Sequence, residues 1–165
     1  MARIEKAVFD AGPLIHLQQI GSLSVLRLFG KIVISNQVRQ ELHGGFPLPK
    51  NCSVVELDGK SKDAAKLVSE RYEIGMGEAS AIALAKQKGI ELLFTDDLSA
   101  RDTAKRIGLE PHGTLAIITR AYRENVLNKK EALSCLEKLH ADSTLYLTTD
   151  LLEWARKQIE SYRRL

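Results

Sequence analysis

Short apolar runs alternate with amphipathic segments along the chain, and this alternation predicts strands followed by helices. The apolar runs are rich in β-branched residues and Phe, and most are followed within a few residues by a helical pattern. Strands that alternate with helices indicate a three-layer α/β/α sandwich around a mostly parallel central sheet. The predicted strands are KAVFD at 6–10, KIVIS at 31–35, NCSVVEL at 51–57, ELLFT at 91–95 and EPH at 110–112.

Several helix ends are predicted from local signals. Ser22 and Gly30 bound one expected helix, and Asn36 is expected to cap the helix QVRQELH. Ser99 and Asp102 match the spacing of a capping box, which gives Asp102 a structural role. Helices are also expected at 13–20, led by Pro13, and at 61–73, 77–88, 114–125 and 128–140, the last with a capping box of Asn128 and Glu131.

The C-terminal segment DLLEWARKQIESYRRL, 150–165, has the pattern of an amphipathic helix. Its expected apolar side consists of Leu151, Leu152, Ala155 and Ile159. The sequence shows no internal repeat and no low-complexity tract. With 165 residues, the chain is expected to form one domain with a helical elaboration.

Composition places the chain among globular proteins, because 44% of its residues are apolar and 27% are charged. No apolar run reaches the roughly 20 residues that cross a bilayer, and the first residues are charged, so a cytoplasmic protein without a membrane segment is expected. Cys52 and Cys135 match no metal or redox spacing and are expected to be reduced, structural thiols. A net charge of +3 is compatible with a polyanionic partner but does not establish one.

Acidic residues follow two of the predicted strands. Asp10 ends the first strand, and Asp96 and Asp97 follow the strand LLFT. Because the carboxyl ends of parallel strands meet at one edge of a sheet, these acids are expected to converge there. Glu41 and Glu78 lie in the helices that start at this edge and can join them. Each acid taken alone also has a structural explanation, as a turn former, a complement to a helix dipole or a solvated residue.

Carboxylates gathered in this way repel one another, and a cation would offset the repulsion. Oxygen ligands without interleaved His or Cys favour a hard cation, Mg²⁺ or Mn²⁺, which in proteins supports hydrolysis of phosphodiesters. The sequence has no phosphate-binding GxxxxGK loop and no GxSxG elbow. A haloacid-type phosphatase would carry an Asp where Gly12 stands. None of the four histidines has zinc spacing, and His16 is the one nearest to Asp10.

The sequence resembles the PIN-domain nucleases, and within them a prokaryotic group close to the VapC-like toxins. The resemblance covers roughly residues 5–120 and lies in VFDAGPLIHL, IVISNQVRQEL, GEASAIALA and FTDDLSAR, in which Asp10, Glu41, Glu78 and an Asp of the pair 96–97 match the acids of the family. The family pattern Thr-x-Asp favours Asp97, but related sequences also place an acid at position 96. The segment IGLEPHGTL resembles the same subgroup.

The resemblance implies a Mg²⁺- or Mn²⁺-dependent endoribonuclease, often inhibited by a small antitoxin protein and often a homodimer. It implies a PIN-like nuclease domain at 1–125 and a C-terminal helical extension at 126–165 that packs on it. The chain departs from the family at Gly12, where many members have Ser or Thr, and at Glu78, where Asp is common. The implied catalytic residues are Asp10, Glu41, Glu78, Asp96 and Asp97, and all of these except Glu41 are the implied metal ligands.

The predicted substrate is RNA or single-stranded DNA, whose phosphates attract cations regardless of base sequence. Candidate phosphate contacts are Arg39, Arg101, Lys105 and Arg106, and the resemblance adds Thr114. Solvated helix faces have the same appearance. The aromatic side chains Tyr146, Trp154 and Tyr162 are expected in the core or in dimer contacts. Two other functions fit the same acids: a binding module for nucleic acid or antitoxin that does not cleave, and a small phosphatase.

Overall fold

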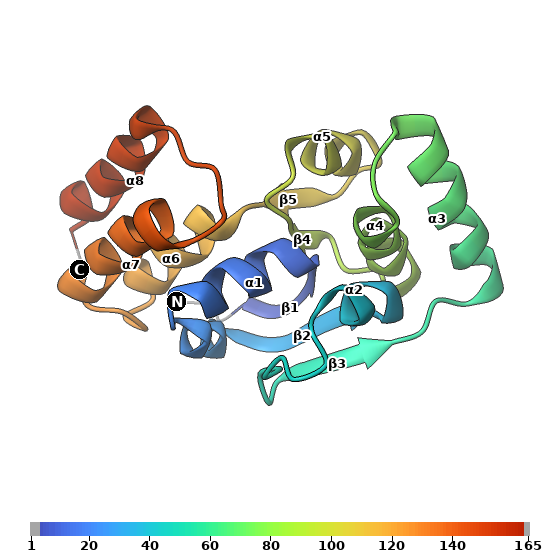
Figure 1. Cartoon of the computed structure of the whole chain (residues 1–165), viewed down its shortest axis with the longest axis horizontal. Helices are drawn as coiled ribbons and strands as arrows, with labels where there is room; N and C mark the ends of the chain where they lie inside the picture. Colours follow the sequence, from blue (N-terminus) through green and yellow to red (C-terminus); the bar gives the residue numbers. More distant parts are fainter. Residues whose placement is uncertain (1–3, 164–165) are drawn as a thin grey trace.

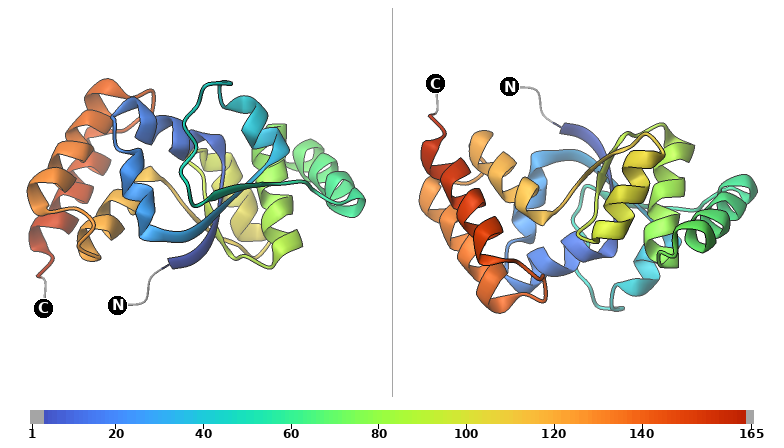
Figure 2. Two further views of the ribbon diagram at one scale, coloured as in Figure 1. Left: turned by 90° about the horizontal axis from the view of Figure 1, so that it is seen from below. Right: turned by 90° about the horizontal axis from the view of Figure 1, so that it is seen from above.

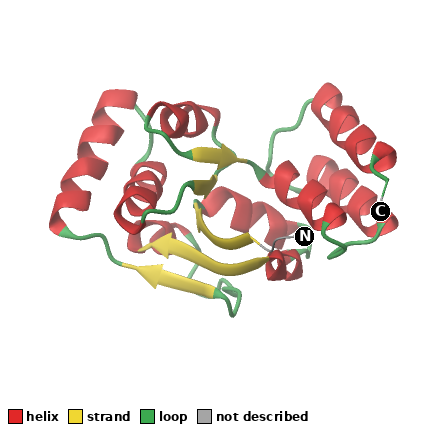
Figure 3. Ribbon diagram, turned by 180° about the vertical axis from the view of Figure 1, so that it is seen from behind, coloured by secondary structure: helices red, strands yellow, loops and turns green. Residues whose placement is uncertain are grey.

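The computed structural model describes residues 4–163, and within them a single sheet of five parallel strands forms the centre of the molecule (Figure 1). The strand order is β3-β2-β1-β4-β5, so the chain starts in the middle of the sheet and fills it outward on both sides. Helices lie on both sides of these strands, which confirms the predicted α/β/α sandwich (Figure 3). The strands are β1 (Ile4–Phe9), β2 (Phe29–Ser35), β3 (Cys52–Val55), β4 (Leu92–Phe94) and β5 (Glu110–His112).

All of the helices predicted from periodicity are present, with one change of type. The segment between Ser22 and Gly30 forms a 3₁₀ helix, η1 (Leu23–Leu28), and β2 already begins at Phe29. Gly30 is therefore not a helix stop; a Cβ there would lie 2.8 Å from the Glu5 carbonyl oxygen. The α-helices are α1 (Ala11–Gln19), α2 (Asn36–Glu41), α3 (Gly59–Tyr72), α4 (Met76–Lys88), α5 (Leu98–Arg106), α6 (Thr114–Arg123), α7 (Lys129–Asp142) and α8 (Thr149–Ser161).

Two of the predicted helix caps are wrong. Ser35, rather than Asn36, caps α2, because its Oγ accepts the Val38 N–H at 3.0 Å. Asp97 caps α5 through the Ala100 N–H at 2.7 Å, so the proposed capping box of Ser99 and Asp102 does not form. Asp102 instead forms an ion pair with Arg106 one turn later, at 3.0 Å.

The core is built around three phenylalanines from three strands. Phe9, Phe29 and Phe94 pack with ring centroids 4.9–5.2 Å apart, within the range of favourable aromatic pairs. The cluster of buried apolar side chains continues from the sheet into the C-terminal helices. The sheet and the C-terminal helices thus share one core.

Helices α7 and α8 lie side by side at the end of the molecule opposite α3 (Figures 1 and 2). The capping box predicted for α7 is confirmed, since Asn128 and Glu131 exchange side-chain and backbone hydrogen bonds. On α8, Leu152, Ala155 and Ile159 are buried as predicted, but Leu151 is 41% exposed.

Cys52 and Cys135 are unpaired, as predicted. Among the described residues, no helix is both long and apolar enough to span a bilayer.

Candidate active site

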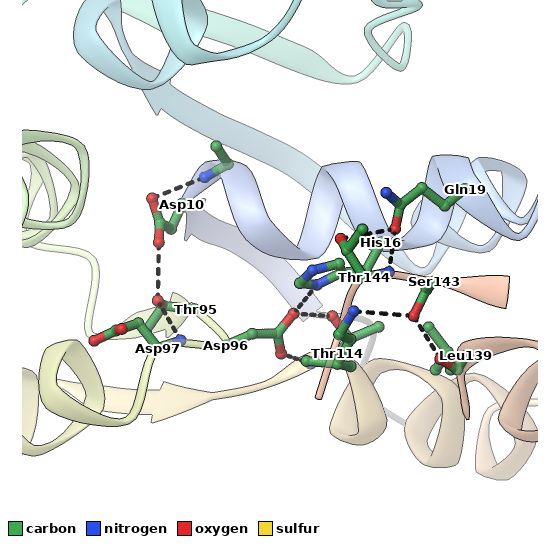
Figure 4. A network of polar contacts seen from close by, with 12 residues as sticks. Asp10, His16, Gln19, Thr95, Asp96, Asp97, Thr114, Leu139, Ser143 and Thr144 are labelled. Atoms are coloured by element: carbon green, nitrogen blue, oxygen red, sulfur yellow. Dashed lines mark hydrogen bonds and ion pairs between the residues drawn. The ribbon is translucent and has the colours of Figure 1, made fainter. Parts of the chain in front are cut away.

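Asp10 occupies the point where β1 ends and α1 begins, and it is the most deeply buried acid of the predicted site, with 5% of its surface exposed. Its Oδ1 accepts the Ala11 N–H at 2.8 Å, which caps α1, and its Oδ2 accepts the hydroxyl of Thr95 at 2.9 Å. Thr95 follows β4, the strand beside β1, so the parallel pairing of the two strands brings this donor to Asp10 (Figure 4). These hydrogen bonds fix the orientation of the carboxylate.

The pKa of Asp10 is raised to about 7. Burial is the largest cause, and the negative charge of Glu78 is the second; Glu41 adds a smaller contribution in the same direction. The hydrogen bonds from Ala11 and Thr95 lower the pKa but do not offset these effects. Ionised Asp10 is therefore destabilised in this site, first by burial and further by two neighbouring carboxylates.

Glu41 and Glu78 approach Asp10 from α2 and α4, which pack against each other. Glu41 is an exposed residue, yet its carboxylate lies so close to the backbone of Gly77 that a Cβ at this position would overlap it. Burial of this carboxylate, followed by the charge of Glu78, raises the pKa of Glu41. We call Asp10, Glu41 and Glu78 the acid crevice.

Two serine hydroxyls connect the start of α2 to the first turns of α4 beside the acid crevice. Ser35 Oγ, which caps α2, lies 2.7 Å from Ser80 Oγ in a fully buried contact. The Ser80 hydroxyl donates to the Gly77 carbonyl oxygen at 2.8 Å, in the first turn of α4. This contact fixes the turn that carries Glu78. Sequence reasoning missed both serines because their pairing joins residues 45 positions apart.

Asp96 and Asp97, which are adjacent in the chain, point in opposite directions (Figure 4). Asp97 is exposed and caps α5 through Oδ1. Asp96 Oδ1 accepts the Thr114 N–H at 2.6 Å, and Oδ2 accepts the Thr114 hydroxyl at 2.5 Å. Because the two side chains diverge, the repulsion expected between neighbouring carboxylates is weakened.

His16 completes the surroundings of Asp96. Its Nδ1 lies 2.6 Å from Asp96 Oδ2, within hydrogen-bonding distance. We call Asp96, His16 and Thr114 the Asp96 cluster; it joins α1, the end of β4 and the start of α6. The structure thus brings Asp10, Glu41 and Glu78 together, and separates Asp96 from them by turning it toward donors.

The predicted phosphate contacts are spread over different parts of the molecule. Arg101 lies in the first turns of α5, with its Nη1 3.3 Å from the position of a Cβ on Gly113, beside the Asp96 cluster. Lys105 and Arg106 lie in the last turn of α5, where Arg106 pairs with Asp102. Thr114 is fully buried, and both of its donors are used on Asp96.

Arg39 lies beside Cys52 of β3: burial raises the pKa of this thiol to about 11, and the charge of Arg39 opposes the rise. Arg101 is therefore the predicted phosphate contact that the structure places next to the Asp96 cluster.

The acid crevice was tested for its fit to a divalent cation. Among the described residues, no three His, Cys, Asp or Glu side chains are arranged as a ready-made metal site. The donors of the crevice are nevertheless all carboxylate oxygens, the ligands that hard cations such as Mg²⁺ and Mn²⁺ prefer. The pKa of Asp10 is raised mainly by burial and also by the negative charges of Glu78 and Glu41, which a cation would neutralise. The chemistry of the residues fits such an ion.

Comparison with known proteins identifies the family. The family model DUF3368, described as a PIN domain, matches residues 6–161. No curated protein and no solved structure gives a significant match. The match begins within β1 and spans the rest of the sheet, the acid crevice and all of α8. The fold agrees with it in having a five-stranded parallel sheet in the described residues. The chain belongs to the DUF3368 family of PIN domains.

Proposed function

We propose that this protein is a metal-dependent endoribonuclease that hydrolyses phosphodiester bonds of RNA. The observation that carries the proposal is the buried Asp10, whose pKa is raised to about 7 by burial and by Glu78 and Glu41. A site built only for stability gains nothing from three facing carboxylates, whereas a hydrolase with a cation in this position needs them. PIN domains are generally nucleases that use divalent metals, and family membership supports the same reaction.

In this proposal Asp10, Glu41 and Glu78 hold the Mg²⁺ or Mn²⁺ ion. The exposed Asp97 follows Thr95 in the chain, and its N–H donates to the Thr95 hydroxyl that bonds to Asp10. The chemistry that such an ion supplies is activation of water and neutralisation of charge on the phosphate. Thr95 and the Ala11 N–H orient the Asp10 carboxylate, so its free lone pairs keep a fixed direction. Arg101 binds a phosphate of the substrate by charge, without regard to base sequence.

The test is cleavage of a single-stranded RNA by the purified chain with Mg²⁺ or Mn²⁺, repeated with excess chelator. We expect endonucleolytic products with metal and none with chelator. Asp10→Asn should not cleave, whereas Asp63→Asn, which removes an exposed acid of α3, should cleave as the wild type does. Cleavage that survives chelator, or an Asp10→Asn variant as active as wild type, would contradict the proposal.

A specific observation favours a second candidate, a PIN-fold module that binds RNA or a protein partner without cleaving. Asp96, one of the acids that the resemblance assigns to catalysis, has both carboxylate oxygens engaged by Thr114 and His16. A site deprived of one acid can retain binding and lose turnover. Thermal melts separate the two functions: if Mn²⁺ raises the midpoint of wild type but not of Asp10→Asn, and no RNA or single-stranded DNA is cut, the binding module replaces the nuclease.

The biological role that we propose is that of a toxin, inhibited by a small antitoxin encoded beside it, and active as a homodimer. The support is the resemblance of the acid motifs to VapC-like toxins. Expression of wild type should arrest growth, and expression of Asp10→Asn should not. An adjacent short reading frame whose product copurifies with the chain and relieves the arrest would support the role; growth unaffected by an active nuclease would contradict it.

A further inference from the structure

The chain contains a single tryptophan, and it lies on the wall of a large groove rather than in the core. Trp154 of α8 is 54% exposed, Tyr146 in the segment before α8 is 86% exposed, and Leu151 is 41% exposed. The groove has a volume of about 1130 Å³ and lies between this wall and β5 with its flanking residues. Figure 1 shows α8 standing apart from β5 and α5 on this side of the molecule. Trp154 and Tyr146 therefore do not lie in the core, the first of the two places predicted for them, whereas Tyr162 packs against it. The second place, a dimer contact, stays a prediction.

The same groove reaches the end of the sheet at which the acids gather. Asp96 and Arg101 line it at the carboxyl end of β4, and α6 adds Arg123 and also Arg120, which pairs with Glu124 at 2.8 Å. The Nε of Arg101 is buried and has no hydrogen-bond partner among the described residues. Arg123 stacks over the Tyr162 ring and donates to Gln158 of α8, which fixes its position on the wall. Cations and exposed rings therefore lie along one continuous surface.

The opposite end of the groove is acidic. Three acids, Glu5, Glu91 and Glu110, and one cation, Lys6, line it where β1, β4 and β5 begin, so its net charge is negative. These strand starts lie at the far edge of a parallel sheet from Asp96. Phosphates are repelled from this end and attracted to Arg101. The charge distribution thus gives the groove a direction and limits how far along it a polyanion extends.

We infer that this groove binds a short single-stranded stretch of nucleic acid on the way to or from the acid crevice, with bases stacked on Trp154 and Tyr146 and a phosphate on Arg101. The inference rests on the proposed function and extends it to α8. Base stacking on exposed aromatic rings beside cations is how proteins hold single strands without reading their sequence. A duplex cannot use these rings because its bases are already stacked.

The principal competing occupant of such a groove is a second copy of the chain. A dimer contact would gain from the exposed leucine, but it would also bury Glu5, Glu91 and Glu110, and Glu is depleted in protein interfaces. The phosphates of a nucleic acid would bind the cations, and its bases would stack on the aromatic rings. This is why we assign the groove to nucleic acid.

The single tryptophan makes the inference directly measurable. The full-length Asp10→Asn variant, kept in chelator so that cleavage plays no part, is titrated with a short oligouridylate while the fluorescence of Trp154 is recorded. Stacking should quench the emission with a saturable dependence on oligonucleotide. With a labelled oligonucleotide and anisotropy, Trp154→Ala should bind about tenfold more weakly, Trp154→Phe should bind nearly as well as the parent, and Leu67→Ala on exposed α3 should not change binding.

The outcomes separate this inference from the nuclease proposal. Quenching by the oligonucleotide supports nucleic-acid binding in the groove even if wild type never cuts RNA. A comparison with oligothymidylate shows whether the groove prefers RNA or DNA. Binding by anisotropy without quenching and without loss in Trp154→Ala overturns it. It is equally overturned if emission depends on protein concentration alone and Trp154→Ala converts a dimer to a monomer, because the occupant is then a second copy.

Discussion

The acid crevice and the Asp96 cluster lie close together at the carboxyl edge of the sheet, yet their carboxylates have opposite surroundings. In the crevice, Asp10 faces Glu78 and Glu41, and its pKa is raised to about 7 by burial and by these charges. In the cluster, Asp96 faces the hydroxyl and N–H of Thr114 and the imidazole of His16. The comparison shows that the neighbours of an acid, rather than its place in a motif, decide whether its negative charge is compensated. An uncompensated carboxylate attracts a cation, whereas a carboxylate that accepts hydrogen bonds from several helices and strands holds those elements together.

The largest expected effect that distinguishes the two regions is on cleavage. Asp10→Asn should lower the rate of RNA cleavage by roughly a hundredfold or more, the scale of losing one preorganised electrostatic group in an active site. The same variant should retain the wild-type fold, since Asn keeps an oxygen for the Ala11 N–H. Gel-based rates together with circular dichroism check this. A folded Asp10→Asn with wild-type rates would remove the acid crevice from the reaction.

The next effect is the pH dependence of stability. Unfolded Asp10 ionises near 3.8 and folded Asp10 near 7, so between these values the folded state binds the extra proton. The free energy of unfolding of wild type should therefore fall as pH rises from about 4 to 7 and level off above, relative to Asp10→Asn. The difference in pKa corresponds to roughly 4 kcal/mol at most. Denaturant titrations of both proteins in chelator measure it, and two parallel curves would show that folding does not raise the pKa of Asp10.

A smaller loss is expected from Asp96→Ala, and it concerns stability rather than chemistry. Removal of this acceptor leaves the Thr114 N–H and hydroxyl and the His16 imidazole without their partner, which should cost about 2–3 kcal/mol. For a chain of this length the melting midpoint should fall by roughly 4–12 °C. Asp96→Asn, which keeps an acceptor, should lose less. An Asp96→Ala variant that melts as wild type does would show that the cluster contributes no stability.

The smallest effects come from two glycines, each beside one of the regions. In Gly77→Ala the added Cβ overlaps the Glu41 carboxylate, which belongs to an exposed and movable side chain, so cleavage should fall about tenfold while the midpoint stays level or rises. In Gly113→Ala the Cβ lies 2.8 Å from Asp96 Oδ1, which its hydrogen bonds hold in place, so stability should fall by about 1 kcal/mol. If both variants responded alike in melts and in cleavage, the acid crevice and the Asp96 cluster would not differ in function as we expect.

Much of the fold could be predicted from local sequence signals. Two predicted capping boxes, one correct and one wrong, show where such signals become insufficient. Asn128 and Glu131 form the predicted box because α7 begins at Lys129, directly after the cap. Ser99 and Asp102 have the same spacing but do not form one, because Asp97 caps α5 two residues earlier. Spacing alone does not show which of two possible caps starts a helix, since that depends on the path by which the chain leaves β4.

The sequence by itself determined the alternation of strands and helices, and with it the edge at which Asp10, Glu41 and Glu78 meet. Both follow from local periodicity and from the geometry of parallel strands, which places carboxyl ends together. Only the tertiary structure decided that Asp96 turns toward His16, 80 residues away, and that Trp154 lies exposed on a groove wall. The physical reason is that distant elements decide both features. Whichever elements pack beside a strand end or a helix face determine where the side chain points and whether the face is buried, and a local sequence pattern does not contain this information.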